Sequence, residues 1–173
     1  MEPKLERSNK EKILRRLAKL LEPAGFKRSK PTFYTRVRLP VIEFVLVHKF
    51  TFEPSFRLHL GIRVVNDPLR AVALNGPDSD EFRGPASVFA SKRLYNFDYD
   101  ESNDSLERCA LDISNFVATA GETWFESNRD LEQLALSPES PLSSDARAAL
   151  IRALAGEIED QFVTQTRTAL NAP

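Results

Sequence analysis

Cations and one aromatic ring alternate with apolar residues along the predicted strands, and these side chains are the best suited to chemistry. Guanidinium groups bind phosphate oxygens through paired hydrogen bonds, and an aromatic ring among them can stack on a base. We expect one face of the sheet to present Tyr34, Arg36, Arg38, Lys49, Arg57, His59 and Arg63, with Lys27, Arg28 and Lys30 at its entrance. Two interpretations are open. The face either binds anions or a partner, or its charge is neutralised by acidic residues of the same chain.

Metal binding and nucleophilic catalysis have less support. We expect His48 and His59 on opposite faces of the sheet, where they cannot bind one metal ion, with His48 in the core and His59 at the surface. Cys109, the only cysteine, falls on the apolar stripe of a predicted helix near Glu107 and Asp112, which favours an inert packed thiol. We predict no catalytic residue, no metal site and no cofactor.

An acidic cluster lies around the end of the last predicted strand. Its carboxylates could hold a hard cation, but their spacing lacks the twelve-residue calcium loop with a central glycine and a final glutamate. A solvated sheet edge accounts for them equally well. The cluster consists of Asp98, Asp100, Glu101 and Asp104.

Recognisable catalytic motifs are missing from the sequence. It contains no glycine-rich phosphate loop, nucleophile-elbow serine, paired-histidine zinc motif or nucleotide fingerprint, and only 6 glycines. This favours a binding protein over an enzyme and leaves open a small hydrolase whose site assembles only in three dimensions. Trp124 and Phe125 are interpreted as closing the core over a sheet edge; the alternative is that Trp124 is an aromatic anchor for a partner.

Basic residues are concentrated in the first part of the chain and acidic residues in the rest. Residues 1–70 hold 16 Lys and Arg against 7 Asp and Glu, residues 71–173 hold 8 against 18, and the formal net charge is −1. Opposed fields attract phosphates, charged partners or the other half of the molecule. Our hypothesis is a non-enzymatic interaction module that binds a protein partner or a second copy of itself. The alternative is nucleic-acid or phosphate binding carried by Arg57, Arg63, Lys27, Arg28 and Tyr34.

Length and composition suit one globular domain, since the chain has 173 residues of which 42% are hydrophobic. No apolar run is long enough to cross a bilayer, and the first residues lack the apolar stretch of a secretory signal. One cysteine excludes an internal disulfide. We therefore expect a cytoplasmic protein without a membrane partner.

The first elements can be predicted with their pairing. Ser8 and Glu11 have capping-box spacing ahead of a helix that Pro23 and Gly25 end. Strands 33–38 and 41–50 form a hairpin around Leu39-Pro40. Matching of apolar and charged side chains pairs Val37 with Ile42, Thr35 with Phe44, Phe33 with Leu46 and Arg36 with Glu43.

A second hairpin turns near Glu53-Pro54, and two registers compete for it. A tight loop places His48 opposite His59, whereas a shift of one residue exchanges the two faces of the strand. Burial of apolar side chains favours the shifted register. It pairs Phe50 with Leu58, Leu46 with Ile62 and Phe44 with Val64.

Helices dominate the rest of the chain. Asn66-Asp67-Pro68 indicates a short helix to Leu74, followed by a loop over 75–86 and a strand over 95–100. Further helices are expected from about Asn103, loosened at Gly121, then over 127–136 and over about 144–170.

Short motifs resemble a bacterial family, the domain of unknown function 4304. The resembling segments are Leu20–Arg28, Thr32–Arg36, the pair Leu60-Gly61, the pair Trp124-Phe125 and Asp130-Leu131-Glu132. The resemblance covers roughly residues 8–136. It implies a leading helix, two strands and a later helix, and it implies no activity.

These patterns predict an α+β fold. We expect an N-terminal helix, an antiparallel sheet of about four strands, and C-terminal helices packed on one face. Residues 1–136 form a single α+β domain, and residues 137–173 a helical extension packed on it.

Overall fold

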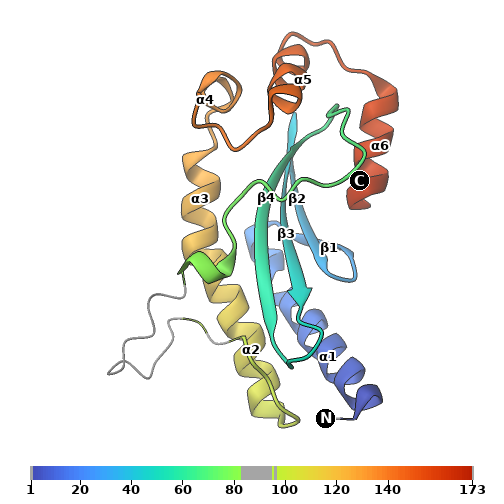
Figure 1. Ribbon diagram of the computed structural model, residues 1–173, viewed down its shortest axis with the longest axis vertical. Helices are drawn as coiled ribbons and strands as arrows, with labels where there is room; N and C mark the ends of the chain where they lie inside the picture. Colours follow the sequence, from blue (N-terminus) through green and yellow to red (C-terminus); the bar gives the residue numbers. More distant parts are fainter. Residues whose placement is uncertain (1, 83–94, 96, 173) are drawn as a thin grey trace.

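A four-stranded antiparallel sheet with helices around it forms the molecule (Figure 1). The computed structural model describes residues 2–82, 95 and 97–172. Helix α1 (Pro3–Leu21) precedes the strands, which lie in the order of the chain: β1 (Lys27–Lys30), β2 (Phe33–Arg38), β3 (Val41–Lys49) and β4 (Phe56–Val64). The later helices are α2 (Asn103–Phe116), α3 (Glu122–Ser127), α4 (Leu131–Leu136), α5 (Ser144–Leu154) and α6 (Asp160–Leu170). The predicted α+β class is confirmed.

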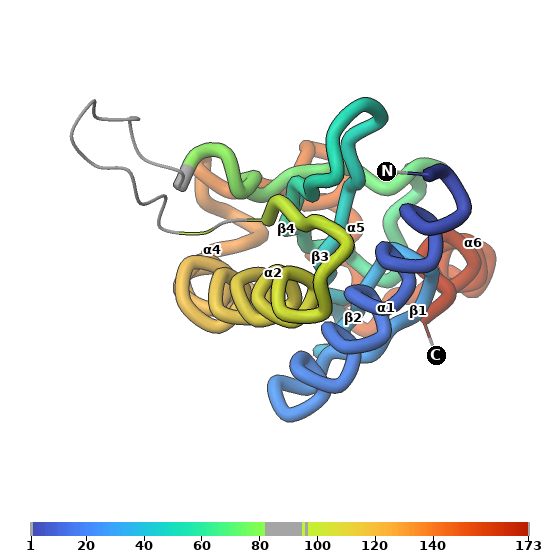
Figure 2. Tube along the Cα trace, turned by 90° about the horizontal axis from the view of Figure 1, so that it is seen from below, coloured from blue at the N-terminus to red at the C-terminus, as the bar shows by residue number. Residues whose placement is uncertain are grey.

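The main core lies between one face of the sheet and helices α1 and α2. Figure 2 shows these two helices side by side, on the same side of the strands. Leu58 and Leu60 of β4 are fully buried there with Leu14 of α1 and Ile113 of α2. No helix in the described part of the chain combines the length and apolar character that crossing a membrane requires.

Helix α1 begins earlier than the capping-box prediction placed it. Pro3 occupies the first turn, where its missing N–H costs nothing, and Glu2 is the residue before it. Ser8 and Glu11 therefore lie inside the helix, and that prediction is wrong. The predicted end is confirmed: α1 stops at Leu21, and Gly25 has a φ of 84°, which favours glycine.

The hairpin of β2 and β3 has the predicted register. Val37 pairs with Ile42, Thr35 with Phe44, Phe33 with Leu46 and Arg36 with Glu43.

The hairpin of β3 and β4 has neither predicted register. Leu46 pairs with His59 and His48 with Arg57, and a loop spans residues 50–55. The burial argument failed because both faces of the sheet are covered. Val45 and Val47 pack with Leu58 in the main core. The apolar side chains on the other face of β3 can therefore be buried on the opposite side of the sheet.

The second face of the sheet has its own smaller core under α6. Ile42 and Phe44 of β3 pack there with Leu170 of α6 and with Ala172. Phe44 lies across β4 at Gly61, where a Cβ would be 2.1 Å from the Phe44 Cζ. The absence of a side chain at Gly61 is therefore what lets the ring pack flat on the strand.

The segment after β4 covers the outer edge of that strand instead of forming the predicted helix. The Asn75 side chain accepts from the Ile62 N–H (3.0 Å) and donates to the Ile62 carbonyl (2.8 Å). The Leu58 N–H donates to the Ser79 hydroxyl (3.0 Å). The helix predicted from Asn66-Asp67-Pro68 to Leu74 is wrong: the carbonyls of Leu69 and Ala71 accept from the Arg63 guanidinium, and residues 75–79 then satisfy the free strand edge.

The strand predicted over 95–100 is also wrong in the residues described. Only an isolated bridge between Ser55 and Asp98 forms there, and the fourth strand of the sheet is β1. Residue 96, and residues 83–94 that include part of the predicted 75–86 loop, lie outside the described residues. Within that loop Ser79–Phe82 forms a short 3-10 helix, η2.

The C-terminal helices are shorter than predicted. A π-helical turn, η3 (Val117–Gly121), joins α2 to α3 at the place where Gly121 was expected to loosen the helix. Asp130 caps α4 by accepting from two backbone N–H groups, so α4 begins at Leu131. The last predicted helix is two helices, because the chain turns at Gly156 with a φ of 83°.

Two glycine substitutions should change stability in opposite directions. Gly61→Ala forces a methyl group into the buried Phe44 ring and should lower the free energy of unfolding by about 1–3 kcal/mol. Gly121→Ala meets no atom closer than 3.5 Å in a helical segment and should raise it by about 0.5–1 kcal/mol. Urea denaturation of both variants measures this, and an unchanged Gly61→Ala protein would contradict the packing described.

Candidate functional site

The observed register divides the predicted basic face between the two sides of the sheet. Arg36 pairs with Glu43 on the side of the main core, whereas Arg57 pairs with His48 on the other side. The prediction of one shared basic face is therefore wrong. Tyr34, Arg36, Arg38 and Lys49 lie on the side of the main core, and Arg57, His59 and Arg63 lie on the side of the second core.

Arg36 is a buried cation held between two carboxylates. Its Nε donates to the Glu43 carboxylate (2.5 Å), and its two terminal nitrogens donate to Glu122 of α3 (2.7 and 3.0 Å). The guanidinium also lies 4.3 Å from the centre of the Phe26 ring and 5.4 Å from that of Phe125. Arg36 joins the sheet to α3 and is not free to bind an external anion.

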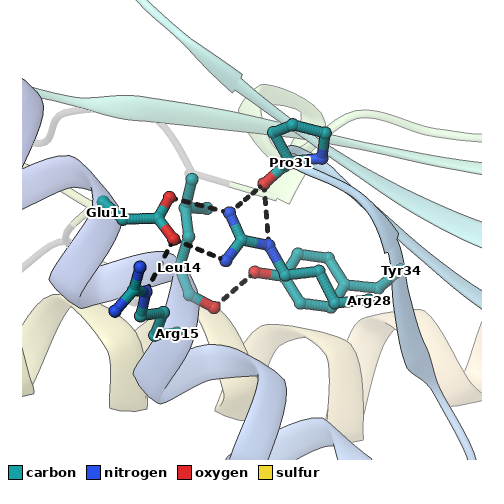
Figure 3. A network of polar contacts seen from close by, with 6 residues as sticks. All are labelled: Glu11, Leu14, Arg15, Arg28, Pro31 and Tyr34. Atoms are coloured by element: carbon teal, nitrogen blue, oxygen red, sulfur yellow. Dashed lines mark hydrogen bonds and ion pairs between the residues drawn. The ribbon is translucent and has the colours of Figure 1, made fainter.

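Arg28 and Tyr34 are also committed within the chain (Figure 3). Arg28 donates to both oxygens of Glu11 on α1 (2.9 Å each) and to the Pro31 carbonyl. The Tyr34 hydroxyl donates to the Leu14 carbonyl (2.7 Å), and the ring is fully buried. These contacts fasten β1 and β2 to α1 and leave neither side chain available for a base or a phosphate.

On the opposite side of the sheet, Arg57 and His59 lie beside an acidic segment. Arg57 pairs with Asp78 (2.5 Å) and with Asp80 (3.2 Å). His59 and His48 share this face, with ring centres 6.3 Å apart, so their predicted placement on opposite faces is wrong. The predicted core position of His48 is also wrong, because its side chain is exposed. Burial and the charge of Arg57 lower the pKa of His59.

The two lysines of β1 differ in their contacts. The Lys30 Nζ donates to the Ala169 carbonyl of α6 (2.5 Å), whereas Lys27 is exposed and has no polar partner among the described residues. Among the predicted anion-binding residues, only Lys27 is exposed and also lacks a polar partner in the described part of the chain.

Arg63 differs from the other cations, because it is 3% exposed and its hydrogen-bond partners among the described residues are all neutral. Its Nε donates to the Thr166 hydroxyl of α6 (2.8 Å), and its terminal nitrogens donate to the carbonyls of Ala71 and Leu69 (2.6 and 2.5 Å). Burial lowers its pKa, and the charge of Asp67 opposes this effect. A buried cation without a hydrogen-bonded carboxylate is costly, which marks its surroundings as a candidate site.

Thr166 connects Arg63 to a groove of about 270 Å³ between α6 and the turn of β2 and β3. Leu39 and Ile158 at this groove are 70% and 52% exposed. Neighbouring exposed aliphatic side chains are typical of a binding surface. The aliphatic lining consists of Val37, Leu39, Ile42, Val65, Ile158 and Val163.

Two charged side chains line the groove. Arg167 is exposed, and its guanidinium has no hydrogen bond or ion pair with any residue in the described ranges. Asp160 lies seven residues earlier on α6, which is about 10 Å along a helix. The groove therefore offers an apolar wall with a cation and a carboxylate separated along α6, an arrangement suited to binding an amphiphile.

Sequence reasoning missed this groove, and none of the predicted site residues lines it. The signal in the sequence was the spacing of Val163, Asp160 and Arg167 in the last helix, with Ile158 just before it. That signal could not be connected with the turn at Leu39 without knowing that α6 packs on the second face of the sheet.

The other predicted candidates are held by local contacts. Burial raises the pKa of Cys109 to about 12, and its Sγ donates to the Phe97 carbonyl (3.3 Å). Asp100 accepts from the Ser102 N–H and hydroxyl at the start of α2, which lowers its pKa. No group of three or more metal-binding side chains occurs among the described residues. Trp124 is half-buried, with its ring centre 5.2 Å from that of Phe125.

Comparison of this chain with models of protein families, with curated proteins and with solved structures finds no match. The resemblance to the domain of unknown function 4304 stays a prediction.

Removal of the Arg36 side chain should destabilise the fold strongly. Arg36→Met leaves the Glu43 carboxylate, whose side chain is 5% exposed, without its closest partner, and should lower the free energy of unfolding by about 3–5 kcal/mol. The double variant Arg36→Met/Glu43→Leu should recover part of this loss. Urea denaturation measures both, and Arg129→Gln, which breaks an exposed pair with Glu126, is the control.

Glu11 should make the stability sensitive to acid. Hydrogen bonds from Arg28 and Arg15 lower its pKa from 4.5 to about 2. Because the folded-state pKa is the lower one, the ionised carboxylate stabilises the fold above pH 4.5, and this contribution is lost as the pH falls toward 2.

Thermal unfolding between pH 5 and pH 2 tests this. Glu11→Gln should be less stable than the wild type at the upper end, and the difference should shrink at the lower end. Glu132→Gln, at an exposed position without an ion pair among the described residues, should follow the wild-type curve. A constant difference between Glu11→Gln and the wild type would contradict the expectation.

Proposed function

We propose that this chain is a non-enzymatic binding module of the cytoplasm whose groove beside α6 takes the apolar C-terminal segment of a partner protein. The observation that carries the proposal is the exposed Arg167, which has no ion pair among the described residues and lines an aliphatic groove of about 270 Å³. A guanidinium forms two parallel hydrogen bonds with a carboxylate, and the aliphatic wall buries the apolar side chains that precede it.

The charges around the groove favour one orientation of this segment. Asp160 repels a carboxylate at the far end, so the terminal carboxylate belongs at Arg167. Arg63, buried behind Thr166, adds positive charge to the wall of the groove without being exposed itself. The small number of polar groups lining the groove supports binding more than catalysis, which requires several convergent titratable groups.

Intramolecular pairing of charges weighs against the predicted alternative of nucleic-acid binding through the sheet. Arg36 bonds to Glu122, Arg57 to Asp78 and Arg16 to Glu107, so cations of the basic half are neutralised by the acidic half of the same chain. A protein partner with a complementary C-terminus needs none of these cations.

A pair of matched peptides tests the proposal. A fluorescent hexapeptide ending in Leu-Val-Leu with a free carboxylate should bind about tenfold or more tightly than its C-terminal amide, because hydrogen bonds between charged groups are lost in the amide. Arg167→Gln should remove this preference, whereas Arg129→Gln, remote from the groove lining, should keep it. Fluorescence anisotropy measures all four combinations.

Two results would contradict the proposal. One is equal binding of the acid and the amide to the wild-type protein, and the other is a preference that survives Arg167→Gln. Octanoate is added as a competitor: if it binds more tightly than the peptide, the groove takes a free carboxylic acid and not a protein segment.

A further inference from the structure

A second cavity lies at the elbow between α3 and α4, remote from the groove beside α6. Its volume is about 460 Å³, and the half-buried residue Trp124 lines it together with polar residues of the α3–α4 region. An added Cβ at Gly76 would lie 2.7 Å from the Trp124 ring, so the segment along β4 holds the edge of the indole. The aromatic surface is therefore fixed in place before any ligand arrives.

The backbone around this cavity is also preorganised. Asp130 caps α4, the Ser140 hydroxyl donates to the Leu134 carbonyl (2.5 Å), and Arg147 of α5 donates to the Ser137 carbonyl (3.2 Å). A site whose walls are already ordered loses little conformational entropy on binding.

Several polar groups at the cavity have unused hydrogen-bonding capacity. The Asn128 Nδ2 is committed to the Trp124 carbonyl (2.9 Å), which leaves its side-chain oxygen as an acceptor. The Ser137 hydroxyl accepts from the Glu139 N–H (3.2 Å), which leaves its own O–H as a donor. The side chains of Gln133 and Glu139 are exposed and have no polar partner among the described residues. The cavity thus offers both donors and acceptors.

The charge of the lining limits the class of ligand. Glu139 is the only charged side chain that lines the cavity in the described part of the chain, and no lysine or arginine does so. A phosphate or carboxylate would find no cation in this lining, and the neighbouring Arg147 already donates to the Ser137 carbonyl. A neutral ligand whose groups both donate and accept, and which has one apolar face for the indole, fits this lining.

We propose that this cavity binds a neutral carbohydrate, with a pyranose ring stacked on Trp124 and its hydroxyl groups bonded to Gln133, Glu139, Asn128 and Ser137. A pyranose has C–H groups on its faces and hydroxyl groups around its rim, and each hydroxyl both donates and accepts a hydrogen bond. Binding sites for small ligands combine an apolar surface with a few placed polar groups in the same way.

The single tryptophan of the chain makes the test specific, because all tryptophan emission comes from Trp124, which lines this cavity. The wild-type protein is titrated with glucose, N-acetylglucosamine, maltose, cellobiose and chitobiose. We expect a saturable change in emission with at least one of them. Gln133→Ala should weaken that binding about five- to tenfold through the loss of one hydrogen-bonding amide.

The matched controls lie outside the cavity. Gln161→Ala on α6 and Glu132→Gln on α4 remove the same groups at exposed positions that do not line it, and both should bind like the wild type. All substituted side chains are exposed, so the variants should fold. Glu139→Gln keeps the ability to hydrogen-bond and should reduce sugar binding less than Gln133→Ala does.

Two results would overturn the proposal. The first is no saturable response to any of the five sugars. The second is a response to tetramethylammonium but not to sugars, abolished in Glu139→Gln, which would identify a cation site on the indole. Neither result depends on the groove beside α6, so this test and that of the C-terminal peptide fail independently.

Discussion

Arg36 connects the two oppositely charged halves of the chain at a buried position. It faces Glu43 across the hairpin of β2 and β3, reaches Glu122 on α3, and stacks on Phe26 and Phe125. Loss of either partner leaves a charge in surroundings that solvate it poorly, so the sheet and α3 are constrained to meet at this point. The position of α3 in turn fixes Trp124 and the elbow that leads into α4.

Burial of both faces of the sheet is the second constraint. Helices α1 and α2 cover one face, whereas α6 and the segment after β4 cover the other. The cations on the sheet are consequently drawn into internal pairs, and the sorted charge of the sequence is largely used to hold the molecule together. The groove beside α6 stays accessible to other molecules at the margin of the sheet, where it is lined by Arg167 and by the exposed side chains of Leu39 and Ile158.

The two cavities differ in chemistry because different elements build them. Side chains of β2, β3 and α6 meet over an aliphatic surface, and the polarity of that groove is confined to Asp160, Thr166 and Arg167. The elbow between α3 and α4 consists largely of helix ends and turn residues, where serine and amide side chains are common because they satisfy free backbone groups. One site therefore favours an apolar segment with a charged end, and the other favours a neutral polar ring.

Local sequence patterns determined the elements whose causes are local. The end of α1 ahead of Pro23 and Gly25, the register of the first hairpin with Arg36 opposite Glu43, and the start of α2 at Asn103 follow from short-range chemistry that the residues themselves carry. The register of β3 against β4 and the fate of residues 66–74 depended on which element covers each face and edge of the sheet. Only the tertiary structure decided these, and with them the sides on which Arg57 and Arg63 lie, because burial is a property of distant segments brought together.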